Sequence, residues 1–400
     1  MNFPRILKKR KGYIDRIKPF MQKSVVKVLT GQRRVGKSFL LYQLIEEILA
    51  EEPDANIIYV NLEDFTFSSL QTAEDLHSYI ISHSKEKAKN YIFIDEIQDI
   101  PGFEKVIRSL LLNEDNDIYI TGSNAKMLSG ELATYLSGRY IEFKIYSLSY
   151  SEFLEFHGLT ESETSYELYS RYGGLPYLLN LPLEDETVNE YLKSVYSTIV
   201  FRDVVSRYKL RNTLFLEKLI QFLSENIGNL FSAKNISDYL KSQHTTISVN
   251  QIQSYTEYLN NAFLIHRVER YDLIGKRVFE IGEKYYFENM GIRNIVIGYR
   301  ITDKAKILEN LVYNHLLYKG YDIKVGYYGD KEIDFIGEKN GEKLYIQVAL
   351  KIDGDTAERE FGNLLKIQDN YPKIVVTEDT FSGNSYEGIR HCPIRQFLME

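Results

Sequence analysis

The residues with the clearest chemical potential are the eight from Gly31 to Ser38, which read GQRRVGKS. A glycine, four variable residues and then Gly-Lys-Ser is the spacing of a loop that wraps the phosphates of a nucleotide. Glycines let the backbone approach phosphate oxygens, and successive N–H groups then point at them. Lys37 would reach the outer phosphates and Ser38 would bind Mg²⁺. The predicted cofactor-binding residues are Gly31, Gln32, Arg33, Arg34, Val35, Gly36, Lys37 and Ser38.

Two adjacent carboxylates, Asp95 and Glu96, end the apolar run 91–94. Such a run is typical of a buried parallel strand whose carboxyl end meets a ligand. Asp95 would hold Mg²⁺ through water, and Glu96 would polarise the water that attacks the γ-phosphate. Ordinary surface acids at a strand end are the alternative. Because one carboxylate can serve the metal and the other the water, the pair favours hydrolysis over binding alone.

A third apolar run, 117–121, is followed by small polar residues up to Asn124. These side chains suit hydrogen bonding to a γ-phosphate or positioning of water, so Asn124 is a candidate catalytic residue. Arg139 stands directly before the next β-like run and could reach the nucleotide of a neighbouring subunit as an arginine finger. A solvated or internally paired arginine is the alternative for Arg139.

The elements that must position these residues alternate between strand and helix. Strands are expected near 24–29, 56–62, 91–95, 117–121 and 140–146, with helical stretches between them. This alternation predicts an α/β domain, residues 1–146, built on a parallel sheet covered on both faces. Residues 147–205 turn helical and form a predicted lid. The Gly173-Gly174-Leu175-Pro176 run inside it either closes over the nucleotide or is an ordinary helix break.

Composition bounds the class of protein. Of 400 residues, 44% are hydrophobic and 26% are charged, which is typical of a soluble globular protein. The single cysteine, Cys392, excludes an internal disulfide and fits a reducing compartment. No run approaches eighteen consecutive apolar residues, so no membrane association is expected. We therefore expect a cytoplasmic protein.

Charge is distributed unevenly along the chain. The formal net charge is −7, yet residues 1–37 hold twelve lysines and arginines against one acid, Asp15. The basic segment could serve the nucleotide, DNA or an acidic neighbouring surface, and a solvated face is the common alternative.

Residues 206–290 predict a winged-helix module. Helices are expected at 213–226, 233–241 and 248–262, followed by β-rich runs at 264–271 and 277–287. The third helix carries no lysine or arginine, whereas phosphate contacts need cations. The wing supplies Arg267, Arg270, Lys276 and Arg277. DNA binding and a structural or protein-docking role both remain open for this module.

Residues 291–400 predict a restriction-endonuclease-like α/β domain. A helix at 304–318 carries Glu309, and strands at 321–328, 332–337 and 344–351 carry Asp334 and Gln347. A helix at 356–370 and a strand at 373–377 follow. Convergence of Glu309, Asp334 and Gln347 would form a second Mg²⁺ site.

Several stretches together resemble prokaryotic AAA-type ATPases that carry a C-terminal PD-(D/E)XK nuclease-like domain of unknown function. The stretches are GQRRVGKS (31–38), FIDEIQ (93–98), GSNAKMLS (122–129), YLSGRYIEF (135–143), YGGLP (172–176), KYYFENMGIRN (284–294), LEN (308–310), EIDFI (332–336) and YIQVA (345–349). The resemblance covers nearly the whole chain. It implies a five-stranded ATPase sheet, a preference for ATP, and a homo-oligomer in which Arg139 acts between subunits.

The sequence departs from that family at one position. Active nucleases of this type place a lysine two residues after the position of Gln347, where this chain has Ala349. Lys351 lies further along the same predicted strand and is a candidate replacement. Two functions therefore stay open: an Mg²⁺-dependent ATPase that handles DNA through a weakly cleaving or non-cleaving nuclease-like domain, and a nucleotide-gated switch that binds a protein partner.

Overall fold

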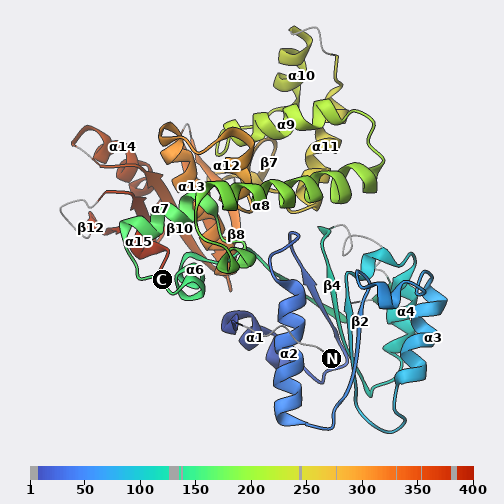
Figure 1. Ribbon diagram of the computed structural model, residues 1–400. Helices are drawn as coiled ribbons and strands as arrows, with labels where there is room; N and C mark the ends of the chain where they lie inside the picture. Colours follow the sequence, from blue (N-terminus) through green and yellow to red (C-terminus); the bar gives the residue numbers. More distant parts are fainter. Residues whose placement is uncertain are drawn as a thin grey trace. The chain divides into compact units, whose positions relative to one another are not determined.

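The computed structural model describes residues 8–125, 135–136, 138–242, 246–275, 277–329, 331–352, 354–379 and 385–400 (Figure 1). The side chains of 277–281 and 354–359 are outside this description. The chain divides into two compact units. The first unit comprises Met1–Tyr146 with Asn261–Phe263, and the second comprises Ser147–Asn260 with Leu264–Glu400.

A five-stranded parallel sheet forms the centre of the first unit. Its strands are β1 (Val26–Thr30), β2 (Asn56–Asn61), β3 (Asn90–Asp95), β4 (Asn116–Gly122) and β5 (Tyr140–Lys144), in the order β2-β3-β4-β1-β5. All neighbouring pairs are parallel. Every residue of β1, β3 and β4 is buried, which explains why apolar residues dominate these strands. The predicted parallel sheet is confirmed.

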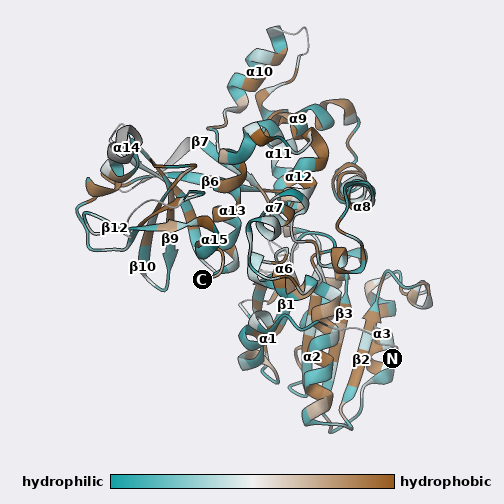
Figure 2. Cartoon of the chain, turned by 60° about the vertical axis from the view of Figure 1, so that its left-hand side comes forward, coloured by the Kyte–Doolittle hydropathy of each residue, from teal (hydrophilic) through white to brown (hydrophobic). Residues whose placement is uncertain are grey.

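Helices cover both faces of this sheet. They are α1 (Lys11–Ile17), α2 (Lys37–Glu51), α3 (Ala73–His83) and α4 (Phe103–Leu110). Figure 1 shows α2 on one face and α3 with α4 on the other. Apolar side chains of α3 and α4, such as Leu76 and Ile107, pack with alternate residues of the strands in one core. The strands are more uniformly hydrophobic than the two-sided α2 (Figure 2). The predicted helical stretch 125–136 lies largely outside the described residues.

The second unit begins with helices. They are α6 (Tyr150–His157), α7 (Glu163–Tyr172), α8 (Asp185–Thr198), the π-helix η6 (Ile199–Ser206), α9 (Thr213–Glu225), α10 (Ala233–Ser242) and α11 (Val249–Asn261). After α7, Gly173 has φ 70°, and a Cβ there would lie 2.3 Å from Oδ1 of Asn289. A Cβ on Gly174 would lie 2.3 Å from the carbonyl oxygen of Leu148. Close packing inside this unit is therefore a physical reason for both glycines.

An eight-stranded mixed sheet completes the second unit, in the order β12-β13-β11-β10-β9-β8-β6-β7. Its strands are β6 (Ile265–Asp272), β7 (Arg277–Phe287), β8 (Asp322–Tyr328), β9 (Lys331–Lys339), β10 (Glu342–Ala349), β11 (Lys373–Thr377), β12 (Ser385–Tyr386) and β13 (Ile389–Pro393). Helices α12 (Met290–Ile297), α13 (Lys304–Tyr318), α14 (Gly354–Leu365) and α15 (Ile394–Phe397) accompany it.

The two strands of the predicted wing belong to this same sheet. β6 pairs antiparallel with β7 and parallel with β8, opposing Arg270 to Val325. The division predicted at residue 290 therefore does not coincide with a break in the sheet. Three helices followed by two strands occur where the sequence predicts them, and the winged-helix assignment itself stays a prediction.

Two predicted elements end earlier than expected. β10 stops at Ala349, so Lys351 lies beyond the strand and is exposed. α14 ends at Leu365 instead of residue 370. Asp369, which the prediction placed in the helix, accepts hydrogen bonds from the Tyr371 amide and the Tyr345 hydroxyl. An aspartate that bonds nearby backbone in this way favours a turn over a helix.

Candidate functional site

The loop between β1 and α2 has the conformation that its glycines permit. Gly31 has φ 151°, and a Cβ there would lie 2.1 Å from the carbonyl oxygen of Ile145. Gly36 has φ 96° and directly precedes α2, which starts at Lys37. The Lys37 ammonium donates to the carbonyl oxygens of Gly31 and Gln32, both at 3.0 Å. The lysine is thus folded over its own loop, at the amino end of a 15-residue helix, which favours anions.

The two predicted carboxylates lie on the same edge of the sheet as this loop, because β1, β4 and β3 are parallel neighbours in that order among the described strands. Asp95 is 1% exposed, and hydrogen bonds from Ser38 and Thr121 reach its carboxylate. Burial raises the pKa of Asp95, while those two hydrogen bonds oppose the rise. A hydroxyl and a carboxylate in contact are oxygen donors of the kind Mg²⁺ prefers. The residues at this position therefore fit the metal that the sequence implies.

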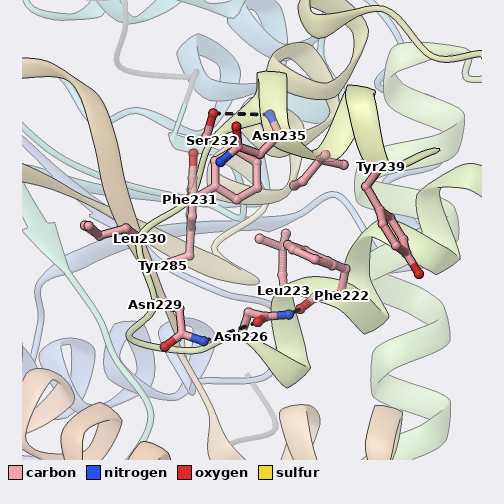
Figure 3. Close-up of a pocket in the computed structure, with 11 residues that line it drawn as sticks. Phe222, Leu223, Asn226, Asn229, Leu230, Phe231, Ser232, Asn235, Tyr239 and Tyr285 are labelled. Atoms are coloured by element: carbon pink, nitrogen blue, oxygen red, sulfur yellow. Dashed lines mark hydrogen bonds between the residues drawn. The ribbon is translucent and has the colours of Figure 1, made fainter. Parts of the chain in front are cut away.

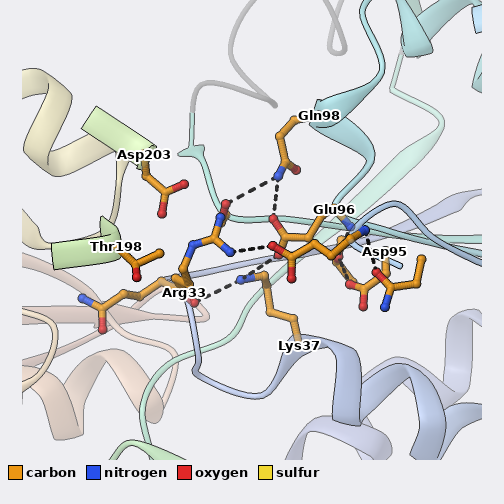
Figure 4. Close-up of polar contacts among 12 residues, drawn as sticks. Arg33, Lys37, Asp95, Glu96, Gln98, Thr198 and Asp203 are labelled. Atoms are coloured by element: carbon orange, nitrogen blue, oxygen red, sulfur yellow. Dashed lines mark hydrogen bonds and ion pairs between the residues drawn. The ribbon is translucent and has the colours of Figure 1, made fainter. Parts of the chain in front are cut away.

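Glu96 lies at the centre of a second set of contacts, drawn in Figure 4. Its Oε1 is 3.7 Å from the Lys37 ammonium, and its Oε2 accepts a hydrogen bond from Gln98. Burial opposes ionisation of Glu96, but the positive charges of Lys37 and Arg33, with Gln98 and Ser123, lower its pKa overall. Glu96 also has φ 57°, a strained backbone conformation for a residue other than glycine. Such strain is common at functional positions.

Thr121, at the end of β4, links the two carboxylates. Its hydroxyl donates to Oδ1 of Asp95 and accepts from the backbone amide of Glu96 at 2.9 Å. The sequence places Thr121 at the end of the predicted strand 117–121 and gives no sign of this role. Because β4 lies between the loop and β3, a threonine at its carboxyl end is well placed to align both acids.

Arg10 supports the loop from outside and was treated in the sequence only as part of a basic segment. It is 3% exposed, and its guanidinium donates to the carbonyl oxygens of Val35 and Tyr146, at 3.2 and 2.8 Å. Its backbone amide donates to the side chain of Gln43 on α2. No local pattern marks this role, because the partners are 25 and 136 residues away.

The remaining predicted residues of this site differ in burial. Asn124 is 4% exposed and follows β4 on the same edge as Asp95 and Glu96. Arg34 is exposed and has φ 70°. Arg139 is exposed, and its carbonyl oxygen accepts from the amide of Val26 at the start of β1. The β1 pairing thus holds the backbone of Arg139 while its side chain remains available.

In the second unit, the structure brings Glu309 and Asp334 together in what we call the acidic cluster, with Glu332. Lys284 of β7 lies in it, its ammonium 3.2 Å from Glu309 and 2.8 Å from Glu332. Burial opposes ionisation of Lys284, but the carboxylates of Glu309, Asp334 and Glu332 raise its pKa overall. Burial and Glu309 raise the pKa of Asp334 well above its usual range.

Gln347 lies on the strand beside Asp334. It is 8% exposed, and its Oε1 has no hydrogen-bond partner among the described residues. An extra residue in β9 between Ile333 and Ile336 forms a bulge opposite β8, and bulges re-aim side chains. Within the described residues, no group of three or more His, Cys, Asp or Glu side chains is arranged to hold a metal ion.

A pocket of about 240 Å³ lies in the helical part of the second unit (Figure 3). Its lining residues are Phe222, Leu223, Asn226, Asn229, Leu230, Phe231, Ser232, Asn235, Ile236, Tyr239 and Tyr285. None of these lining side chains is charged, so the pocket lacks the cations that a phosphate would need. Among the described residues, no helix has the length and apolar character required to span a membrane.

Two family models match successive parts of the chain. Residues 23–154 match the family model of an AAA domain, and residues 163–303 match a domain of unknown function (DUF8612). The nuclease-like assignment of residues 291–400 finds no support in these matches. The Walker-type ATPase PABY2304 of Pyrococcus abyssi is 15% identical, covering 73% of this chain and 96% of its own, with a TM-score of 0.49.

Two relatives extend over most of the chain. An uncharacterised protein of Haemophilus influenzae is 38% identical over 403 residues, covering 98% of each chain. The uncharacterised protein MJ1544 of Methanocaldococcus jannaschii is 30% identical over 352 residues, covering 84% of this chain and 77% of the relative. The chain therefore belongs to the same protein family as these two relatives, and its first unit is an AAA-type P-loop domain.

Proposed function

We propose that this protein is an Mg²⁺-dependent ATPase. The observation that carries the proposal is the convergence of Lys37, Ser38, Asp95 and Glu96 at one edge of the parallel sheet. Lys37 and the loop amides bind the phosphates, while Ser38 and Asp95 hold the metal, which neutralises phosphate charge. Glu96 orients the attacking water and accepts its proton. The preference for ATP over GTP rests on the family resemblance.

Phosphate release and nucleotide binding by three purified variants test this proposal. Lys37→Ala should abolish both, because it removes the phosphate-binding ammonium. Glu96→Gln should abolish turnover and still bind ATP, because it keeps the shape of the site and loses the base. Lys105→Ala, an exposed lysine of α4, should behave like the natural protein. Unchanged turnover in Lys37→Ala or Glu96→Gln would refute the assignment.

Arg139 is proposed as a finger that acts on a neighbouring copy of the chain. Its exposure at the start of the edge strand β5 supports this role. Mixing Arg139→Ala subunits with Lys37→Ala subunits should restore part of the hydrolysis, because one interface then has an intact loop and an intact finger. Absence of rescue, together with a monomeric mass in the presence of ATP, would make Arg139 a surface residue.

For the second unit we propose that ATP hydrolysis is coupled to DNA handling without robust cleavage. The helices α9–α11 with β6 and β7 support a winged-helix module, and Glu309 and Asp334 support a nuclease-like core. Lys284 already compensates the acidic cluster, which disfavours a second metal ion there. We therefore expect no cleavage of plasmid DNA with Mg²⁺ and ATP. Cleavage lost in Asp334→Ala and retained in Lys37→Ala would refute this expectation.

A nucleotide-gated switch that binds a protein partner is the second candidate. Two described cations of the predicted wing are already engaged: Arg267 pairs with Glu269 at 3.1 Å, and Arg270 stacks over the ring of Tyr327. Titration of a DNA duplex against Glu96→Gln, with and without ATP and at rising salt, separates the two candidates. Binding that weakens steeply with salt supports DNA handling. No retention at low salt with ATP supports the switch.

A further inference from the structure

Arg33 lies in the middle of the phosphate loop, yet its side chain is directed into the site and not into solvent. The residue is 5% exposed, and its guanidinium donates to Oε1 of Glu63 at 2.8 Å. Glu63 follows β2 by two residues, on the edge of the sheet where Asp95 and Glu96 lie. In Figure 4 the Arg33 guanidinium lies beside Lys37 and Glu96. The neighbouring Arg34 is exposed and shares none of this burial.

The charges around Arg33 indicate why an arginine is buried there. Burying a cation is expensive unless partners compensate it. Glu63 is a half-exposed partner, 36% exposed at its side chain, and its carboxylate accepts a hydrogen bond from one guanidinium nitrogen of Arg33. The positive charge of Arg33 also favours the ionised form of Glu96 and lowers its pKa. A planar guanidinium has five N–H donors in a fixed fork, and it suits phosphate oxygens better than a lysine does.

We propose that Arg33 is a catalytic residue supplied by the same subunit that binds the nucleotide: its guanidinium contacts the γ-phosphate. This inference rests on the ATPase function proposed above. The water oxygen attacks the γ-phosphorus, Glu96 accepts the proton of that water, and the bond from phosphorus to the bridging oxygen breaks. The electron pair leaves with ADP. Arg33 neutralises the charge that gathers on the γ-phosphate oxygens during this step.

A different role would be structural, in which the pair of Arg33 with Glu63 only holds the loop in shape. The two roles predict different kinetics. Loss of a contact made in the transition state lowers kcat and leaves KM nearly unchanged, whereas a disordered loop loses nucleotide binding. Chemical rescue adds a second readout, since free guanidinium can replace a missing catalytic guanidinium and cannot rebuild a collapsed loop.

The experiment measures ATP binding and phosphate release for Arg33→Ala, with and without millimolar guanidinium chloride. We expect a fall in kcat of about 10³-fold, as for arginines supplied in cis or in trans to related reactions. We expect KM to change by less than about threefold and guanidinium to restore part of the rate. Arg33→Lys should recover less than guanidinium does. Arg108→Ala, an exposed arginine of α4, is the matched control with unchanged kinetics.

Mixing two inactive variants tests whether Arg33 acts on the nucleotide bound by its own subunit. Arg33→Ala and Lys37→Ala fall in the same loop, so a mixture of these variants should show no rescue, in contrast to the mixture proposed for Arg139. Rescue by mixing would overturn the proposal, and so would a kcat within about threefold of the natural protein or a loss of binding that guanidinium does not repair. If Lys37→Ala itself turns over ATP, the ATPase function fails. If Lys37→Ala is inactive and Arg33→Ala is active, only this inference fails.

Discussion

The ammonium of Lys284 lies 3.2 Å from Oε1 of Glu309, and the hydroxyl of Tyr286 donates to the same oxygen at 2.6 Å. Lys284 is 3% exposed, so its charge has little contact with water. The carboxylates of Glu309 and Glu332 are its compensation in the acidic cluster. A lysine ammonium therefore lies among these carboxylates in the position where the family resemblance implies a metal site.

Replacing Lys284 with methionine should lower the free energy of unfolding, because it removes this compensating charge. Methionine has a side chain of similar length but no charge, so the two carboxylates face each other without a cation. Loss of one partner of a buried pair lowers the free energy of unfolding by about 3–5 kcal/mol. Urea unfolding of Lys284→Met and of Lys366→Met, an exposed lysine of the same unit, measures the difference. Adding Mn²⁺ should restore part of the stability lost in Lys284→Met, because the metal ion can take the place of the missing cation. A cost below about 1 kcal/mol would show that Lys284 is not essential to the cluster.

Thr121 is expected to set the positions of Asp95 and Glu96 during hydrolysis. Thr121→Val removes the hydroxyl that donates to Asp95 and accepts from the Glu96 amide. A hydrogen bond to a charged group contributes about 1.5–3 kcal/mol, which corresponds to a kcat loss of about ten- to a hundredfold. Thr121→Ser keeps the hydroxyl and should retain most of the rate. Steady-state phosphate release decides, and equal rates in Thr121→Val and the natural protein would contradict the role.

Much of the first unit was predictable from the sequence because its signals are local. The loop from Gly31 to Ser38 lies between a strand and a helix, and parallel strands necessarily bring their carboxyl ends to one edge. That rule places Asp95 on the same edge of the sheet as the loop without knowledge of the sheet order. The contacts of Arg10 and of Thr121 could not be predicted, because they depend on which strands are neighbours.

The limit of prediction from the sequence is clearer in the second unit. Glu309 and Asp334 were predicted to converge, and they do approach each other. Lys351, the candidate for the missing lysine, lies beyond the end of β10. Lys284 of β7 lies in the acidic cluster instead. β6, with β7 beside it, joins the sheet through a parallel pairing with β8 that links residues 55 apart, such as Arg270 and Val325. Sequence alternation predicts the face of a residue but not the lateral order of strands.

The pair of Lys27 with Asp117 should matter for stability and not for hydrolysis. Both side chains are fully buried near the amino ends of β1 and β4, away from the phosphate loop, and Tyr119 and the Gln22 amide also donate to Asp117. Lys27→Met should lower the free energy of unfolding by about 3–5 kcal/mol, because it leaves a buried carboxylate without its cation.

The double variant Lys27→Met with Asp117→Asn removes both charges, so it should be less destabilised than the two single changes added together. Phosphate release at temperatures well below unfolding should stay close to that of the natural protein in each variant. Additive single and double effects in a urea titration would show that the two charges are not coupled.

His315 of α13 should make stability depend on pH. It is 6% exposed, and burial, with a smaller contribution from Lys319, lowers its pKa to about 3. The unfolded chain, with an ordinary histidine pKa of about 6.5, then binds the proton more readily than the folded chain. The folded state therefore loses stability as pH falls below about 6.5, by about 1.4 kcal/mol for each pH unit until the folded pKa is reached.

His315→Leu removes this dependence, so the difference in unfolding free energy between the natural protein and the variant should change by about 1.4 kcal/mol between pH 6 and pH 5. A difference that is constant across this pH range would mean that His315 accepts its proton equally well in both states.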